Sequence, residues 1–112
     1  MATLKSSRDV ILRTESWRAA TEFYGAVLGL PEVFRSDTLV GFETGSFRLY
    51  VEQGAAHGPV FEFLVPDVGA ARDRLLAAGC TIREEDPSVP RCYLADPHGL
   101  VFNLGPARPA AG

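Results

Sequence analysis

The sequence is poor in the residues from which several classes of protein build their binding surfaces. Its 112 residues include a single lysine, Lys5, and its 11 basic residues are interspersed among 14 acidic ones. A protein that binds the nucleic-acid backbone needs a stripe of positive charge, which this sequence lacks. Its apolar runs are too short to span a membrane, and its first residues do not form the apolar region of a signal peptide.

Cysteine and histidine are equally scarce. The two cysteines, Cys80 and Cys92, have a spacing that matches neither a disulfide framework nor a zinc motif. They are expected to be reduced thiols, which favours a cytoplasmic location. The two histidines, His57 and His98, lie in turn-like segments. We expect them to be exposed loop residues rather than ligands or bases.

What the sequence does contain is an order of elements that occurs twice. Residues 9–14 and 60–65 are β-rich runs, at an offset of 51 from residue 9 to residue 60. Apolar residues at helical spacing follow each run and predict one buried helix face. Each helix pattern opens at an N-cap candidate and closes at a glycine. These residues are Ser16 and Gly29 in the first half, and Asp67 and Gly79 in the second.

The later strands repeat as well. Residues 45–50 correspond to residues 99–104 at an offset of 54. Asp96, Pro97 and Gly99 suit the first, second and fourth positions of a type I turn that joins the last two strands. A single non-repeating α+β sandwich would explain the same elements, but not their recurrence in one order at nearly one spacing.

The length and an apolar content of 46% suit one globular domain over residues 1–112. We predict an α+β fold of two modules, the first over about residues 7–53 and the second over about residues 59–105. A turn-rich linker at residues 54–58 joins them. The tail at residues 106–112, rich in proline, alanine and glycine, is expected to be disordered.

Several segments resemble the vicinal oxygen chelate superfamily, which includes glyoxalase I, bleomycin-resistance proteins and extradiol dioxygenases. The stretch at residues 19–30, with Phe23, Tyr24 and Gly29, is similar to its FY…LG signature. Residues 65–79 resemble the opening of its second module, and residues 96–99 its closing turn. The resemblance implies a glyoxalase-like fold of two tandem βαβββ modules, with sheets curled around a cleft and helices outside. It also implies a homodimer.

The resemblance further implies four metal-ligand positions, usually histidine and glutamate, in the first and last strands of each module. On this sequence they fall at Asp9, Leu49, Val60 and Asn103. Leu49 and Val60 offer no ligand atom, and one carboxylate with one neutral amide does not make a tight transition-metal site. Shifting any strand by one residue restores no histidine and glutamate set. We therefore expect neither a metal nor another cofactor.

Strand alternation predicts which side chains face the cleft. They form a mixed set of apolar and polar residues, as in many small-molecule pockets. The set is Asp9, Ile11, Arg13, Phe47, Leu49, Val60, Glu62, Arg91, Tyr93 and Asn103. Within it, Arg13 has an alternative interpretation as a structural ion-pair partner of Asp9 or Glu62.

These patterns favour a metal-free protein of the bleomycin-resistance kind that binds a small molecule, either an antibiotic or an aromatic metabolite. One alternative is a lyase or isomerase of glyoxalase type that uses Asp9 or Glu62 as its base. Another is a regulatory or interaction module whose cleft is vestigial. Whether the protein is an enzyme stays open. Its expected partners are a small molecule and a second copy of the chain, with neither nucleic acid nor membrane.

Overall fold

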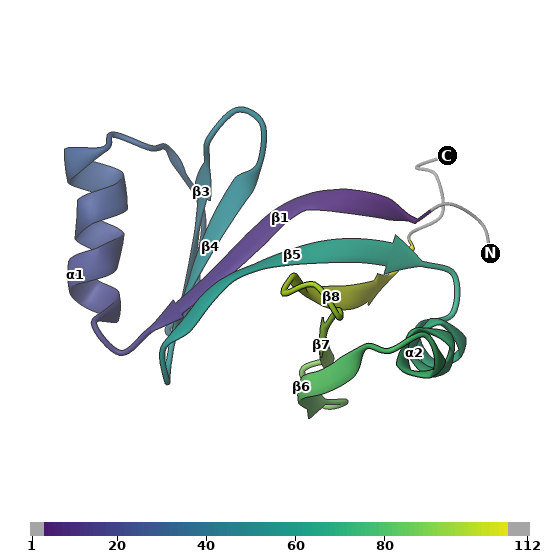
Figure 1. The fold of residues 1–112 in the computed structure, drawn as a ribbon. Coiled ribbons are helices and arrows are strands. Elements are labelled where there is room, and N and C mark those ends of the chain that lie inside the picture. Colours follow the sequence, from purple (N-terminus) through teal and green to yellow (C-terminus); the bar gives the residue numbers. More distant parts are fainter. Residues whose placement is uncertain (1–3, 108–112) are drawn as a thin grey trace. The chain divides into compact units, whose positions relative to one another are not determined.

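The computed structural model describes residues 4–107, which contain the βαβββ order twice (Figure 1). These residues form two compact units. The first unit is Arg8–Val60, and the second consists of residues 4–7 with residues 61–107. The boundary runs through two long strands, β1 (Lys5–Thr14) and β5 (His57–Val65). The predicted α+β class is confirmed.

The first unit is a four-stranded sheet with one helix. Its strands follow the order β2-β3-β4-β1, in which β1 and β4 are parallel and the other pairs antiparallel. The further strands are β2 (Glu32–Arg35), β3 (Leu39–Glu43) and β4 (Arg48–Gln53). The helix begins as α1 (Trp17–Glu22) and continues as the π-helical η1 (Phe23–Val27). Figure 1 shows this helix, in blue, beside β3 and β4.

The helix of the first unit is held to its sheet by apolar packing and one hydrogen bond. Trp17, Ala20 and Tyr24 recur on one face of the helix and pack on the buried Val40, Phe42 and Val51. The indole Nε1 of Trp17 donates to the carbonyl of Val51 at 2.8 Å. The predicted glycine stop is confirmed, because Gly29 has a φ of 72°, which side chains disfavour. Ser16 precedes the helix but makes no side-chain cap.

The second unit has the same plan. Its strands follow the order β5-β8-β7-β6, with β5 and β8 parallel. Its further elements are α2 (Val68–Ala77), β6 (Thr81–Asp86), β7 (Arg91–Ala95) and β8 (Val101–Pro106). Asp67 caps α2, since its carboxylate accepts the Ala70 N–H at 3.0 Å. Leu75 packs with Leu94 and Phe102 in the core of this unit.

The predicted turn between the last two strands is also confirmed. The Asp96 carboxylate accepts the backbone N–H groups of His98 and Leu100 at 2.8 and 2.9 Å. The ordered chain extends beyond the predicted start of the tail, because β8 includes Pro106 and Ala107 donates to the carbonyl of Val65. The rest of that tail, residues 108–112, lies outside the described residues. Within residues 4–107, no helix is long and apolar enough to cross a membrane.

Candidate functional site

Each sheet has one face that its own helix covers and one that it does not; we call the second the open face. In the first unit, strand pairing aligns Ile11 with Tyr50 and Leu12 with Val51. Val51 packs against the helix, so Ile11 and Tyr50 lie on the open face. The same alternation places there the residues two positions away on either side: Asp9, Arg13, Arg48 and Glu52.

The middle of this open face is apolar and aromatic. Ile11, Tyr50, Gly41 and Phe34 follow one another across the four strands, and we call them the aromatic row. The rings of Phe34 and Tyr50 lie 6.3 Å apart between centroids, at 58°. A Cβ atom on Gly41 would lie 2.7 Å from Cε1 of Tyr50. The glycine therefore gives the tyrosine ring the space to lie across β3. Phe34 is 45% exposed.

An ion pair flanks the aromatic row on each side. Arg48 Nε lies 3.0 Å from Asp9 Oδ1, and Arg13 Nη1 lies 3.8 Å from Glu52 Oε1. Arg13 Nε also donates to the carbonyl of Ala55 at 2.7 Å. Arg13 is thus part of an ion pair, as one interpretation of the sequence held, with Glu52 as its partner. The row therefore lies between two neutralised pairs.

The expectation for the last strand of the first module is corrected by one residue. Leu49 packs on the buried cluster beneath the helix, and Val51 lies in that cluster. Phe47 precedes β4, in a turn where its N–H bonds to Thr44 Oγ1. The open face instead carries Arg48 and Tyr50.

The physical reason is the length of the preceding turn. The backbone N–H of Thr44 donates to the carbonyl of Phe47, the residue directly before β4. The backbone N–H of Asp96 donates to the carbonyl of Leu100, the residue directly before β8. The second turn is one residue longer, and aligning Gly45 with Gly99 ignores this difference. A shift of one residue turns every side chain of a strand to the other face. The counterpart of Asn103 is therefore Tyr50.

The second unit carries a polar row at the corresponding positions. Glu62, Asn103 and Tyr93 are aligned across β5, β8 and β7, and Tyr93 is aligned with Glu84 of β6. Asn103 Nδ2 donates to Glu62 Oε2 at 2.9 Å, while its Oδ1 accepts the Cys92 N–H at 2.8 Å. Asn103 is only 7% exposed, so these bonds satisfy a buried amide.

Arg91 completes this polar surface. Its Nη1 lies 2.7 Å from Glu84 Oε2, and its guanidinium carbon lies 5.0 Å from the centre of the Tyr93 ring, a cation–π distance. The structure thus brings together four residues that the sequence placed in one set: Glu62, Arg91, Tyr93 and Asn103. Val60, two residues before Glu62 on the same strand, is an apolar side chain that is buried, with 2% of its surface exposed.

Sequence reasoning missed the aromatic row. Phe34 was not assigned to a cleft strand, and the one-residue error in β4 excluded Tyr50. A signal for both was present in Gly41, inside the β-rich run at residues 39–43. A glycine within a strand often marks a close approach by another group, here the tyrosine ring.

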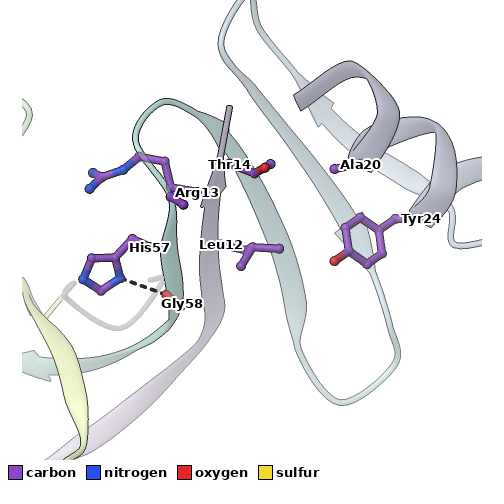
Figure 2. Close-up of a pocket in the computed structure, with 8 residues that line it drawn as sticks. Leu12, Arg13, Thr14, Ala20, Tyr24, His57 and Gly58 are labelled. Atoms are coloured by element: carbon purple, nitrogen blue, oxygen red, sulfur yellow. Dashed lines mark hydrogen bonds between the residues drawn. The ribbon is translucent and has the colours of Figure 1, made fainter. Parts of the chain in front are cut away.

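A cavity of about 440 Å³ lies elsewhere in the first unit, on the helix side of β1 (Figure 2). Tyr24 and Ala20 line it from the helix, and Leu12 from β1. Figure 2 shows Leu12 directed toward Tyr24, whereas Arg13 points to the opposite side of the strand. His57 borders the cavity, with Nδ1 2.9 Å from the carbonyl of Gly58. Of the ten residues expected in the cleft, Arg13 alone borders this cavity.

The metal-ligand positions implied by the resemblance do not supply a donor set. The Asp9 carboxylate is paired with Arg48, and Val60 has no donor atom. The amide oxygen of Asn103 already accepts the Cys92 N–H. Within residues 4–107, no three histidine, cysteine, aspartate or glutamate side chains form a group that fits a metal. Tyr50, which occupies the position expected for Leu49, adds neither a histidine nor a glutamate to this set.

Comparison with known proteins identifies the fold. A family model described as a glyoxalase-like domain matches residues 9–105. A glyoxalase/bleomycin resistance protein/dioxygenase superfamily member from Vibrio splendidus 12B01 is 18% identical with a TM-score of 0.62, over 91% of this chain and 97% of that chain. A hypothetical protein from Bacillus halodurans C-125 is 11% identical with a TM-score of 0.69, over 98% and 99%.

A variant of homoprotocatechuate 2,3-dioxygenase from B. fuscum is also similar in structure. It is 18% identical with a TM-score of 0.65, over 95% of this chain but only 33% of the dioxygenase. No curated protein matches the chain in sequence. At these identities the structural likeness establishes the fold.

Proposed function

The chain belongs to the glyoxalase-like domain family, and from that premise we propose that it is a metal-free protein that binds a planar small molecule, such as an antibiotic or an aromatic metabolite. The observation that carries this proposal is the Phe34 and Tyr50 pair on a sheet face that its own helix leaves uncovered. Family membership alone would not carry it, because one fold supports many functions.

The chemistry of the aromatic row supports a planar, largely apolar ligand. A planar molecule stacked on such rings gains contact beyond its buried area, by about 0.5–1.5 kcal/mol per aromatic pair. The ion pairs of Asp9 with Arg48 and of Arg13 with Glu52 neutralise the charges beside the row. A ligand on the row therefore meets an apolar centre with polar margins, which is the usual character of a small-molecule site.

An enzyme of lyase or isomerase type is the second candidate, and the geometry favours Glu62 over Asp9 as its base. Arg48 Nε lies 3.0 Å from Asp9 Oδ1, so the Asp9 carboxylate is already engaged in an ion pair. Glu62 is bound instead by the neutral amide of Asn103. A base also needs a position within hydrogen-bond reach of the proton that it removes. A Glu62→Ala variant that turns over substrate as fast as wild type would eliminate this candidate.

We expect the protein to act in the cytoplasm, and to form the homodimer that the family resemblance implies. Both cysteines are free and buried, which suits a reducing compartment. Sedimentation of the purified chain would give its mass in solution. A monomer at all concentrations would contradict the expected dimer.

The test of the proposed function is binding of a neutral planar probe, 2-naphthylmethanol, measured by calorimetry. Tyr50→Leu removes the ring at the centre of the aromatic row, and we expect it to weaken binding by about three- to tenfold. Phe47→Leu is the matched control, since it removes an exposed aromatic ring outside the row. The proposal fails if the probe does not bind, or if the two variants weaken its binding equally.

A further inference from the structure

The helix of the first unit covers only part of its sheet. The fully buried side chains beneath it, Val40, Phe42 and Val51, lie on β3 and β4. β1 is the next strand of that sheet, and Leu12, which faces the helix side there, is only half-buried. The cavity of about 440 Å³ lies at this margin of the helix (Figure 2), and every residue that lines it belongs to the first unit.

The walls of this cavity are mainly apolar, and none of its lining residues directs a permanent charge into it. Leu12, Ala20 and the ring of Tyr24 supply the apolar surface. Among the described residues that line the cavity, Arg13 alone carries a permanent charge, and its side chain points to the opposite side of β1. The lining therefore favours a neutral ligand, because a charge buried without a partner is costly. The volume lies within the range of about 300–1,000 Å³ that is typical of ligand pockets.

Two hydroxyl groups give the cavity its capacity for hydrogen bonds. Thr14 lies two residues after Leu12 on β1, and Figure 2 shows both side chains on the side of the helix. The Thr14 hydroxyl accepts the Ser16 N–H at 3.1 Å, but it donates to no residue of the range 4–107. The Tyr24 hydroxyl points toward β1 and makes no hydrogen bond to any residue of that range. Two hydroxyl donors that line one cavity match a ligand oxygen that accepts.

We propose that this cavity is a second ligand site, which takes a compact neutral molecule with an apolar body and one acceptor oxygen, such as a ketone. Thr14 and Tyr24 donate to that oxygen, while Leu12 and Ala20 contact the apolar body. The cavity lies on the helix side of β1, whereas the aromatic row lies on the open face of the same sheet. The inference therefore goes beyond the proposed function and does not depend on it.

The experiment measures binding of camphor, a bicyclic ketone, by calorimetry. Camphor is not planar, so it cannot stack on the aromatic row. Tyr24→Phe removes one hydroxyl group and keeps the ring, and we expect it to weaken camphor binding by about two- to tenfold. Tyr50→Phe makes the same change on the open face of the sheet and is the matched control. It should leave the affinity for camphor unchanged.

A second variant tests where camphor binds. Ala20→Leu places a larger side chain in the cavity, and we expect it to reduce camphor binding below detection while cooperative urea unfolding shows that the variant is folded. If this variant does not fold, the comparison of Tyr24→Phe with Tyr50→Phe decides.

Three results would overturn the inference. They are no binding of camphor to the wild-type protein, equal weakening by the two tyrosine variants, and wild-type affinity in a folded Ala20→Leu variant. None of them alters the binding of 2-naphthylmethanol to the aromatic row, which tests the proposed function separately.

Discussion

At the scale of single residues, two glycines decide what the open faces present. Gly41 lies beneath the ring of Tyr50, and Gly105 lies beside the carboxylate of Glu62. In each case the missing side chain leaves space for a functional group that comes from the neighbouring strand. The two cases differ in what would have to move: a ring packed against Phe34, or the flexible end of a glutamate.

Gly41→Ala tests the first case. The new Cβ atom would lie 2.7 Å from Cε1 of Tyr50 and 3.3 Å from Cβ of Phe34, so the Tyr50 ring must move. We expect a loss of about 1–3 kcal/mol in the free energy of unfolding, as for other overpacked sites, and weaker binding of 2-naphthylmethanol. Gly58→Ala is the control, because nothing lies within 4 Å of the atom that it adds. Urea denaturation and calorimetry give both quantities. Equal stability of the two variants would contradict the close approach.

The two thiols give a second prediction at this scale. Burial raises the pKa of Cys80 and of Cys92, and the negative charge of Glu85 raises that of Cys92 further. A raised pKa leaves little thiolate near neutral pH, so we expect the folded protein to react very slowly with iodoacetamide. Both thiols should react at the rate of free cysteine once urea unfolds the chain. A thiol that reacts quickly in the native protein would contradict this expectation.

The same shifts set a dependence of stability on pH. A thiol with a pKa that is higher in the folded than in the unfolded chain stabilises the fold fully below the unfolded pKa, about 8.5. As the pH rises above this value, the unfolded thiols ionise first. The free energy of unfolding should therefore fall on the alkaline side, and replacing both cysteines by alanine should reduce that fall.

At the scale of elements, the two helices differ in their N-caps, although the sequence predicts a capping residue at the start of each. Asp67 accepts the Ala70 N–H, whereas Ser16 makes no side-chain cap. We expect Asp67→Ala to lower the free energy of unfolding by about 1 kcal/mol, the typical value of an N-cap. Ser16→Ala should cost clearly less. Thermal and urea unfolding of the two variants measure the difference, and a larger loss for Ser16→Ala would contradict the structural assignment.

The elements also show how much of the architecture could be predicted from sequence. The first strand of each module, both helices, their glycine ends and the Asp96 turn depend on short stretches of chain, and the sequence alone indicated them. The register of β4 depends on the exact length of the turn before it, which differs by one residue between the modules. That single residue separates Leu49, in the core, from Tyr50, on the open face.

The candidate site was predictable to different degrees in the two units for this reason. In the second unit, Glu62, Tyr93 and Asn103 share one row, as strand alternation indicated. Their hydrogen bonds could not be predicted, because they depend on which strands pair. In the first unit, Phe34 becomes part of the site only through the pairing of β2 with β3. Contacts between strands are properties of the folded sheet rather than of any local pattern.

At the scale of the whole molecule, the repeat has kept its framework while its two rows have different chemistry. Ile11 corresponds to Glu62, Tyr50 to Asn103 and Gly41 to Tyr93, each pair at the same place in its sheet. One row is apolar and aromatic, and the other is polar, with the carboxylate of Glu62 bound by the amide of Asn103.

The metal content of the whole protein is the last prediction, and it follows from the residues that replace the family's ligands. Asp9 is engaged by Arg48, Val60 has no donor atom, and the amide of Asn103 already bonds to Cys92 and Glu62. We expect elemental analysis of untagged protein, purified without chelator, to find less than about a tenth of an equivalent of Zn, Ni, Fe or Mn. A metal that binds only the folded state would raise the melting temperature, so we expect added Zn²⁺ or Ni²⁺ to leave that temperature unchanged. Near one equivalent of bound metal would contradict the prediction. If the Asp9→Ala variant then lost that metal, the second candidate function would gain a metal and become the leading one.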